Sequence, residues 1–265
     1  MQRIDALSFR EAADRLGGDL PHTRPMLDRR RVAASSVRRC APARQIDTEV
    51  LAAAVELYAN RLMADETALG YLAARGFTRE LLERERIGFA AGGELMSYLV
   101  WRGIAPQRAR RAGLLNADGR EVMQGRIVFP EVRHGRPVWL IGRLLETASD
   151  EVPRYLGLPG SKPLLGWDAA NLDLRGACLA EGPTDWLALR MWGVPGLALC
   201  GTGASPSTLE ALERWERLYL VLDDDDAGHQ ATARLREALG DRAVPVRLPT
   251  GVNDPADLAA RADGG

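Results

Sequence analysis

The sequence is poor in cysteine, in lysine and in long apolar runs, and each shortage excludes a class of protein. Its 265 residues include three cysteines, Cys40, Cys178 and Cys200, which lie far apart and form no CxxC pair. Such cysteines support neither a disulfide framework nor a zinc ribbon, so a reducing, cytoplasmic setting is expected. No stretch approaches 18 consecutive apolar residues and the N-terminal stretch has no apolar signal region, so we expect no membrane association.

The remaining composition is that of a globular protein. Hydrophobic residues make up 46%, charged residues 27%, and the net charge is −1, so neither disorder nor a fibre is expected as the main state. Lys162 is the one lysine among 35 basic residues. That bias is typical of genome composition rather than of a recognition chemistry.

Three segments with different patterns follow one another. Residues 1–45 combine a short predicted helix with an arginine-rich stretch, which could bind phosphate or be a solvated linker. Residues 46–175 show helical periodicity and then strand-like runs. Residues 176–265 alternate strand and helix, which predicts a parallel sheet flanked by helices. The predicted class is therefore α/β, with a helical and β-rich N-terminal subdomain before the parallel sheet.

Carboxylates gather at the ends of two predicted strands. One strand is followed by Glu181-Gly-Pro-Thr-Asp185, and a later one by four aspartates that begin at Asp223. Ligands of open α/β sheets bind beyond the carboxyl ends of the strands, which places Glu181 and Asp223 at one site. Clustered carboxylates repel one another unless a cation neutralises them, and oxygen ligands suit Mg²⁺ or Mn²⁺. Helix capping would explain Asp225 or Asp226, but not Asp223 directly after a buried strand.

The order of these motifs resembles the Toprim domain. Glu-Gly-x-x-Asp and the later Asp-x-Asp-x-x-Gly, with Gly201-Thr-Gly203 between them, are similar to that family over roughly residues 176–257. The family includes bacterial-type primases, topoisomerases, recombination scaffold proteins and nucleases.

The resemblance implies a divalent-metal site. Glu181, Asp223 and Asp225 would be the catalytic residues and, with Asp185 and Asp254, the metal ligands. Asp254 lies in an Asp-Pro-Ala-Asp element that is similar to the Asp-Pro-Asp element of primases, where the inserted alanine displaces the second aspartate.

The upstream chain resembles the catalytic core of bacterial-type DNA primases. The resemblance implies a basic face that grips the template, the initiating nucleotide or the product strand. Arg126, Arg143 and Arg154 match its residues, and Lys162 matches less closely. The segments that carry the resemblance are residues 68–76, 82–89, 125–130, 140–143 and 153–156.

These resemblances imply an enzyme that synthesises short RNA primers on single-stranded DNA by metal-assisted nucleotidyl transfer. NTPs would be its substrates, a short RNA/DNA hybrid its product, and Mg²⁺ or Mn²⁺ its cofactor. A replicative helicase or a separate zinc-bearing protein would be a further partner. Two alternative functions are a Toprim nuclease and a non-catalytic nucleic-acid-binding module of a mobile element. The nuclease would not need the primase-like residues 68–156, and the binding module would not need intact carboxylates. A topoisomerase fragment would need a tyrosine domain for which the chain is too short.

Residues 7–13 resemble the closing helix of the primase zinc-binding domain. The zinc ligands that precede that helix in the family are absent, and His22, Cys40 and His134 lack zinc spacing. We expect the helicase-binding domain of replicative primases to be missing as well. We therefore expect no zinc, and we expect residues 1–45 to be attached only loosely to the core.

Overall fold

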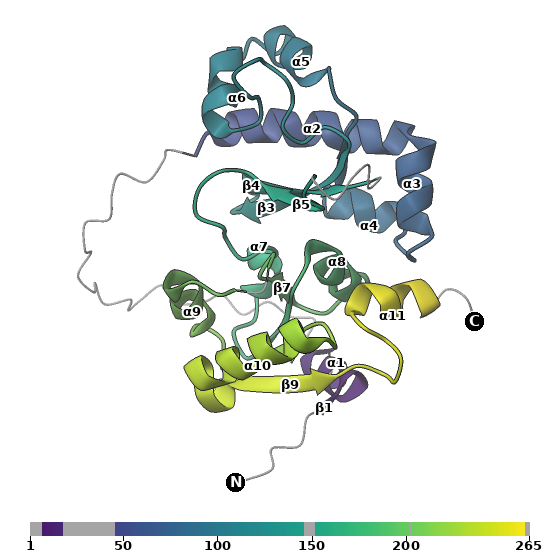
Figure 1. Ribbon diagram of the computed structural model, residues 1–265, viewed down its shortest axis with the longest axis vertical. Coiled ribbons are helices and arrows are strands. Elements are labelled where there is room, and N and C mark those ends of the chain that lie inside the picture. The colour runs from purple at the N-terminus through teal and green to yellow at the C-terminus, as the bar shows by residue number, and fades with distance from the viewer. Residues whose placement is uncertain (1–6, 18–45, 146–151, 202, 263–265) are drawn as a thin grey trace, which may run out of the picture.

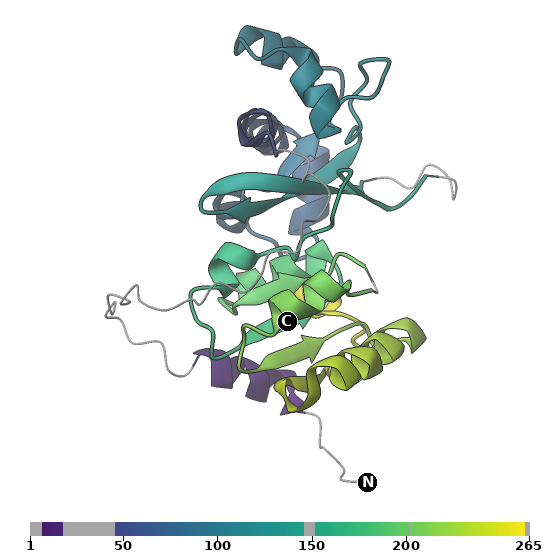
Figure 2. The ribbon, with the colours of Figure 1, turned by 90° about the vertical axis from the view of Figure 1, so that its left-hand side faces the viewer.

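The computed structural model describes residues 7–17, 46–145, 152–201 and 203–262, which form two sheets with helices around them (Figure 1). The predicted basic linker, residues 19–45, lies outside the described residues. One sheet is antiparallel, in the order β2-β3-β4-β5, and the other is parallel, in the order β1-β9-β8-β6-β7. The view turned by 90° shows the antiparallel sheet above the parallel one (Figure 2). The predicted α/β class is therefore confirmed.

The N-terminal body is built on the antiparallel sheet. Side-chain oxygens cap its first three helices: Asp47 accepts from the amide of Val50, Asp65 from that of Ala68, and Thr78 from that of Leu81. The β3–β4 hairpin turns at His134 and Gly135, both with positive φ. The elements are α2 (Thr48–Ala64), α3 (Glu66–Ala73), α4 (Arg79–Arg84), β2 (Gly88–Ala90), α5 (Leu95–Trp101), α6 (Pro106–Ala112), β3 (Arg126–Arg133), β4 (Arg136–Leu144) and β5 (Tyr155–Gly157).

The C-terminal body is the predicted parallel sheet, in which strands and helices alternate. Its strands β6, β7 and β8 are short and fully buried, as expected for a parallel sheet that is covered on both faces, whereas β9 is only partly buried. The elements are α7 (Trp167–Ala170), β6 (Ala177–Ala180), α8 (Pro183–Met191), β7 (Gly196–Ala198), α9 (Pro206–Leu212), β8 (Leu218–Val221), α10 (Asp226–Leu239), η1 (Gly240–Arg242), β9 (Ala243–Arg247) and α11 (Pro255–Ala262).

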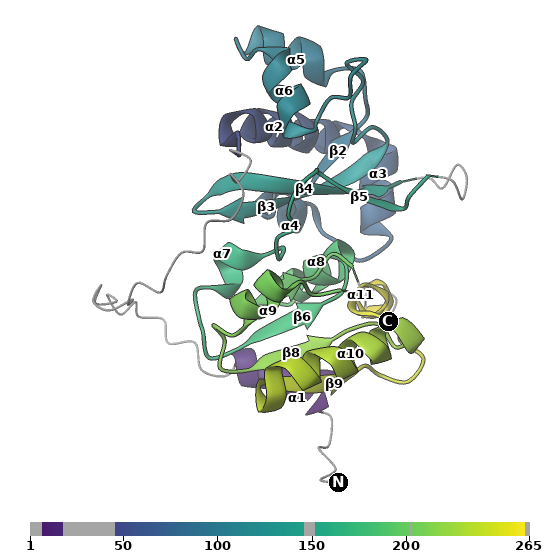
Figure 3. The same cartoon turned by 60° about the vertical axis from the view of Figure 1, so that its left-hand side comes forward.

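Helix α8 joins the two bodies. It lies on the side of the parallel sheet that faces the antiparallel one (Figure 3). Trp186, Leu187 and Ala188 belong to the same buried cluster as residues of α2, β3 and β4. The relative position of the two sheets is therefore set by apolar packing, which matters because the predicted site draws residues from both.

The N-terminal segment packs against the parallel sheet, and the expected loose attachment is wrong for residues 7–17. β1 (Leu7–Ser8) pairs in parallel with β9, and α1 (Phe9–Gly17) follows it. The ring of Phe9 lies 5.1 Å from that of Trp192, and Ala12 is fully buried. A short helix gains stability from such packing, and the added strand covers the exposed edge of β9. The segment boundaries after residues 45 and 175 stay predictions.

No helix among the described residues has both the length and the apolar character that crossing a membrane requires.

Candidate metal and nucleotide site

The two acidic loops leave the parallel sheet side by side. β6 pairs with β8 so that Ala180 lies opposite Val221, and both strands end there. Glu181 follows directly after β6, and Asp223 follows two residues after the end of β8. The sheet register therefore brings together two carboxylates that are 42 positions apart in the sequence (223 − 181).

Glu181 and Asp223 each have a buried oxygen without a hydrogen-bond partner among the described residues. These atoms are Oε2 of Glu181 and Oδ1 of Asp223. Burial, followed by repulsion from Glu181, Asp254 and Asp225, raises the pKa of Asp223 to about 7. Burial and the charge of Asp225 raise the pKa of Glu181. Buried acceptors without donors, in a field of like charges, fit a bound cation.

The carboxylates do not enclose an ion by themselves. Within the described ranges, no three or more His, Cys, Asp or Glu side chains come together closely enough to do so. The fit of this site to a metal ion therefore depends on the two unpaired oxygens of Glu181 and Asp223 and on the repulsion between the neighbouring carboxylates. It does not depend on a complete protein ligand shell, and Mg²⁺ commonly keeps several waters and binds substrate phosphates.

The other three predicted metal ligands have structural partners. Asp225 caps α10 by accepting from the amide of Gly228 at 2.8 Å. Asp254 accepts from the amide of Asp257 at 2.6 Å, in the first turn of α11. Asp185 is 6% exposed and accepts from two backbone amides, those of Gly182 at 3.0 Å and Ala256 at 3.3 Å. Burial and the charges of Asp254 and Asp223 nevertheless raise the pKa of Asp185 to about 8.

Gly228 is required by the close packing of the acidic loop. A Cβ atom at this position would lie 2.0 Å from the backbone oxygen of Asp223. Only glycine lets α10 start this close to the loop, which explains the glycine of the Asp-x-Asp-x-x-Gly motif.

Two of the predicted basic residues line a groove between the two bodies. Arg143 and Arg154 come from the antiparallel sheet region, and Thr184 and Asp254 come from the parallel sheet region. The groove has a volume of about 350 Å³. Burial and the neighbouring carboxylates raise the pKa of Asp223, and the charge of Arg154 partly opposes them by lowering it. This arginine therefore acts electrostatically on the acidic loop.

Arg143 is nearly buried and lacks a full set of partners. It is 7% exposed, and its Nε has no hydrogen-bond partner among the described residues. Its guanidinium lies 5.1 Å from the ring centre of Tyr71. Partly desolvated guanidinium donors with no carboxylate partner are suited to phosphate oxygens.

The remaining two basic residues have different positions. Arg126 is 3% exposed and donates from its guanidinium to the backbone oxygen of Arg154 at 3.1 Å, so it supports the segment that carries Arg154. Lys162 donates to the backbone oxygen of Cys200 at 2.9 Å. The next residue, Gly201, donates its amide to the backbone oxygen of Glu181, so Lys162 lies beside the first acidic loop.

The sequence interpretation missed Arg75 and Tyr71. Arg75 also lines the groove, and its guanidinium lies 3.7 Å from the ring centre of Tyr71. Burial, and then the neighbouring Arg154, lower the pKa of Arg75. Both residues lie in the segment 68–76, which carried the primase resemblance without being assigned a role.

Two protein families match consecutive parts of the chain. The family described as "DNA primase catalytic core, N-terminal domain" matches residues 57–162, and the family described as "Toprim-like" matches residues 178–259. The first match contains the basic groove residues Arg75, Arg143 and Arg154, and the second contains both acidic loops.

Similar whole proteins and solved structures agree with these matches. A DNA primase of Deinococcus radiodurans is 32% identical over 81% of this chain and 41% of its own length, and one of Enterococcus faecalis is 31% identical over 90% and 42%. This chain thus spans about two fifths of these relatives. The RNA polymerase domain of the Mycobacterium tuberculosis primase, in complex with a double-stranded DNA oligomer with a 6-nucleotide overhang, is 26% identical, with a TM-score of 0.69 over 81% of this chain and 78% of that one. A primase catalytic domain bound to single-stranded DNA is 25% identical, with a TM-score of 0.66 over 83% and 76%.

Proposed function

Because most of this chain belongs to the DNA primase catalytic-core family, we propose that it synthesises short RNA primers on single-stranded DNA. One observation carries the proposal. Glu181 and Asp223 have unpaired oxygens, and the charges of Arg154 and Asp254, which line the groove together with Arg143, act on Asp223. A triphosphate and the cation that accompanies it need these two chemistries side by side.

The reaction is nucleotidyl transfer. The 3′-hydroxyl oxygen of one nucleotide forms a bond to the α-phosphorus of an NTP, the bond to pyrophosphate breaks, and the hydroxyl proton leaves to water. Glu181 and Asp223 would hold Mg²⁺ or Mn²⁺ beside Asp225, Asp185 and Asp254. When bound, the ion would neutralise negative charge on the triphosphate and would make the attacking 3′-hydroxyl more acidic.

The protein's own groups orient the phosphates. Arg143 and Arg154 are placed to bind phosphate oxygens in the groove, and Arg75, whose guanidinium stacks on Tyr71, extends the same positive surface. Arg126 holds the backbone of Arg154 in place, and Lys162 adds a positive charge beside the loop of Glu181. Such preformed donors lower the cost of orienting a charged substrate.

The template would lie along the same positive surface as a single strand. A similar primase domain binds single-stranded DNA according to its description, and this supports the proposal. A replicative helicase or a separate zinc-bearing protein as partner, and a cytoplasmic location, stay part of the proposal. The match of residues 57–162 to a primase-core domain speaks against the alternatives of a Toprim nuclease and a non-catalytic module.

The test is incubation of the full chain with single-stranded DNA, NTPs and Mg²⁺, followed by gel analysis of labelled RNA and labelled DNA. Short RNA products that require both template and metal are expected. Shortened DNA without RNA would identify a nuclease, and DNA binding with neither product would identify a binding module.

A further inference from the structure

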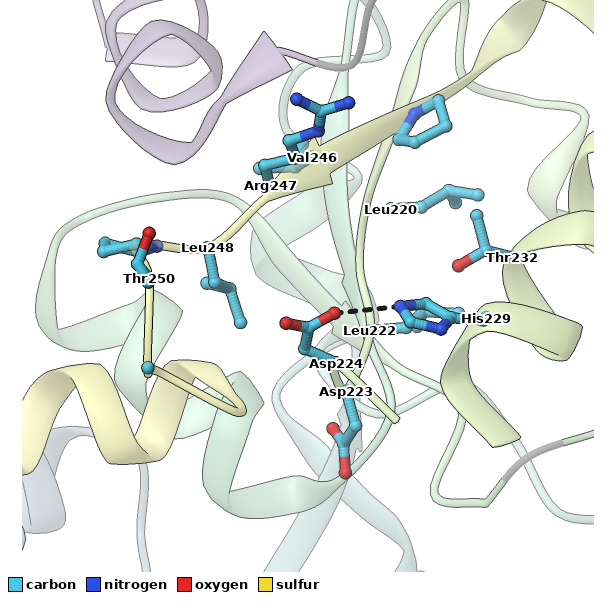
Figure 4. Close-up of a pocket in the computed structure, with 13 residues that line it drawn as sticks. Leu220, Leu222, Asp223, Asp224, His229, Thr232, Val246, Arg247, Leu248 and Thr250 are labelled. Carbon is cyan, nitrogen blue, oxygen red and sulfur yellow. Dashed lines mark hydrogen bonds and ion pairs between the residues drawn. The ribbon is translucent and has the colours of Figure 1, made fainter. Parts of the chain in front are cut away.

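Two grooves of the molecule hold their basic side chains in different ways. In the groove beside Asp224 and His229 (Figure 4), Arg247 is the one arginine or lysine among the described lining residues, and no phenylalanine, tyrosine or tryptophan lines it. Among the residues drawn in Figure 4, Arg247 makes no hydrogen bond or ion pair. In the basic groove between the two bodies, by contrast, Arg75 and Arg143 share one tyrosine ring.

The shared ring is that of Tyr71, on α3. The guanidinium of Arg75, two residues after α3, lies 3.7 Å from the ring centre, and that of Arg143, from β4, lies 5.1 Å from it. A tyrosine ring attracts a cation over its face within about 6 Å of its centre. The two guanidinium carbons are therefore at most 8.8 Å apart, the sum of the two distances, although their like charges repel one another.

Little else holds these two charges in place. Arg143 is 7% exposed, and its Nε has no hydrogen-bond partner among the described residues. The side chain of Arg75 donates to the backbone oxygen of Tyr71 at 3.1 Å, so this contact also leads to the tyrosine. Burial, and then the charge of Arg154, lower the pKa of Arg75, which shows that the groove itself disfavours the charge.

Tyr71 is held by packing and not by its hydroxyl group. The side chain packs against the buried cluster that includes residues of α2, β3, β4 and α8. Its hydroxyl oxygen is buried and has no hydrogen-bond partner among the described residues. The ring is therefore the part of Tyr71 that acts on the two arginines.

Guanidinium groups bind phosphate oxygens through hydrogen bonds of about 2.7–2.9 Å, which require a defined orientation. We propose that Tyr71 is a positioning residue of the basic groove, whose ring holds Arg75 and Arg143 so that both bind the same phosphate group. The inference rests on the proposed function for the source of that phosphate, which is the template strand or the triphosphate of the nucleotide. A neutral side chain then determines the phosphate affinity of the groove.

The test removes the ring and keeps every charge. Tyr71→Leu retains an apolar side chain of high helix propensity, and Tyr71→Phe removes only the hydroxyl. Tyr71→Met, whose flexible side chain fills irregular space, replaces the leucine variant if circular dichroism shows that variant to be unfolded. Tyr98→Leu is the matched control, because Tyr98 also lies under an arginine, Arg102 at 5.7 Å, but on α5 and outside the groove.

The Kd of the full chain is measured in metal-free buffer for both sources of phosphate. Fluorescence anisotropy with labelled oligothymidylate represents the template, and calorimetry with inorganic triphosphate represents the nucleotide. We expect Tyr71→Leu to raise the Kd of at least one probe about tenfold. If that probe is the oligonucleotide, the salt slope of log K should fall by roughly 0.7, although no charge is removed.

Two further measurements separate positioning from a role in the fold. Tyr71→Phe should restore the Kd to within about twofold of the unmodified chain, since the hydroxyl makes no contact, and Tyr98→Leu should change it no more than that. In a chain that carries Arg75→Gln and Arg143→Gln, Tyr71→Leu should have no further effect. A tyrosine that only supported the fold would weaken binding in both backgrounds.

The outcomes separate this inference from the proposed function. Unchanged Kd values for both probes in Tyr71→Leu, an equal loss in Tyr71→Phe or Tyr98→Leu, or a loss that persists without the two arginines would overturn the positioning role. If the unmodified chain makes no primers but Tyr71→Leu weakens phosphate binding as expected, the proposed function is wrong and the positioning role stands.

Discussion

Glu181 and Asp223 differ from Asp185 and Asp257 in what their oxygens accept, although all four carboxylates lie near the same end of the parallel sheet. Glu181 and Asp223 each have a buried oxygen that accepts nothing from the described residues, and their pKa values are raised, as is that of the buried Asp185. Asp185 accepts from two backbone amides. Asp257 accepts from the amide of Asn253 and forms an ion pair with Arg261 at 2.7 Å, and the pKa of Asp257 is lowered, chiefly by Arg261.

The difference shows how a fold divides a set of identical side chains between structure and chemistry. A carboxylate that caps a helix or pairs with an arginine stabilises the fold as it stands. A buried carboxylate with an unpaired oxygen costs stability unless something else binds it. Only the second kind indicates a ligand that is not part of the chain.

The largest expected effect compares one residue of each kind in catalysis. Asp223→Asn should reduce primer synthesis by about 1,000-fold or more, or ~4 kcal/mol, because it removes a charge on which the proposed metal site depends. Asp257→Asn should reduce it less than threefold. Rates of RNA product formation at saturating NTP and Mg²⁺ measure both. Equal losses in the two variants would contradict the division.

The second prediction concerns the structural carboxylate Asp185. Asp185→Ala removes the acceptor that joins the first turn of α8 to that of α11. We expect a loss of about 2 kcal/mol of unfolding free energy, or a Tm lower by roughly 4–8 °C. Thermal unfolding followed by circular dichroism measures it, with the exposed Gln230→Ala as the matched control. An unchanged Tm would show that these hydrogen bonds contribute little.

The third prediction extends the comparison to the arginines. Arg143→Gln should weaken binding to single-stranded DNA about tenfold and reduce the salt slope of log K by roughly 0.7, because one phosphate contact is lost. Arg234→Gln, at an exposed position on α10, should change neither quantity. Fluorescence anisotropy with a labelled oligonucleotide at several salt concentrations measures both. If the two variants behave alike, the groove does not bind the DNA backbone.

The sequence sufficed for features that follow from periodicity and strand order. The alternation after residue 176 predicted the parallel sheet, and the expectation that ligands bind at strand ends brought Glu181 and Asp223 together. The spacing in Glu-Gly-x-x-Asp could not show that Asp185 accepts from the amide of Ala256, 71 residues away. Long-range backbone contacts of this kind leave no periodic signal.

Two other features depended on tertiary packing. The short helix predicted in the N-terminal segment is present as α1 (Phe9–Gly17), and the amide and hydroxyl of Ser8 donate to Glu11 at its start, while the Ser8 hydroxyl accepts from the amide of Glu11. Its attachment to β9 could not be expected, because two strand residues are too few to indicate a pairing partner. Arg75 likewise gains its proposed role only where the two bodies meet across the groove.

The smallest expected effect is the pH dependence that Asp223 gives to stability in metal-free buffer. Since the folded pKa of Asp223 is raised from 3.8 to about 7, its contribution is fully present below pH 4 and is lost as the pH rises through 7. Asp223→Asn should therefore match the unmodified chain at pH 4 and exceed its Tm at pH 8. We expect about 2–4 °C, or ~1 kcal/mol, after discounting the shift for partial solvent exposure. Asp257→Asn should not raise the Tm at pH 8, because the pKa of Asp257 is lowered and its charge stabilises the fold.

Mg²⁺ should then raise the Tm of the unmodified chain and leave that of Asp223→Asn unchanged, since only a carboxylate that lacks a protein partner gains from a cation. A Tm of Asp223→Asn below that of the unmodified chain at pH 8 without metal would show that the Asp223 carboxylate is satisfied within the protein.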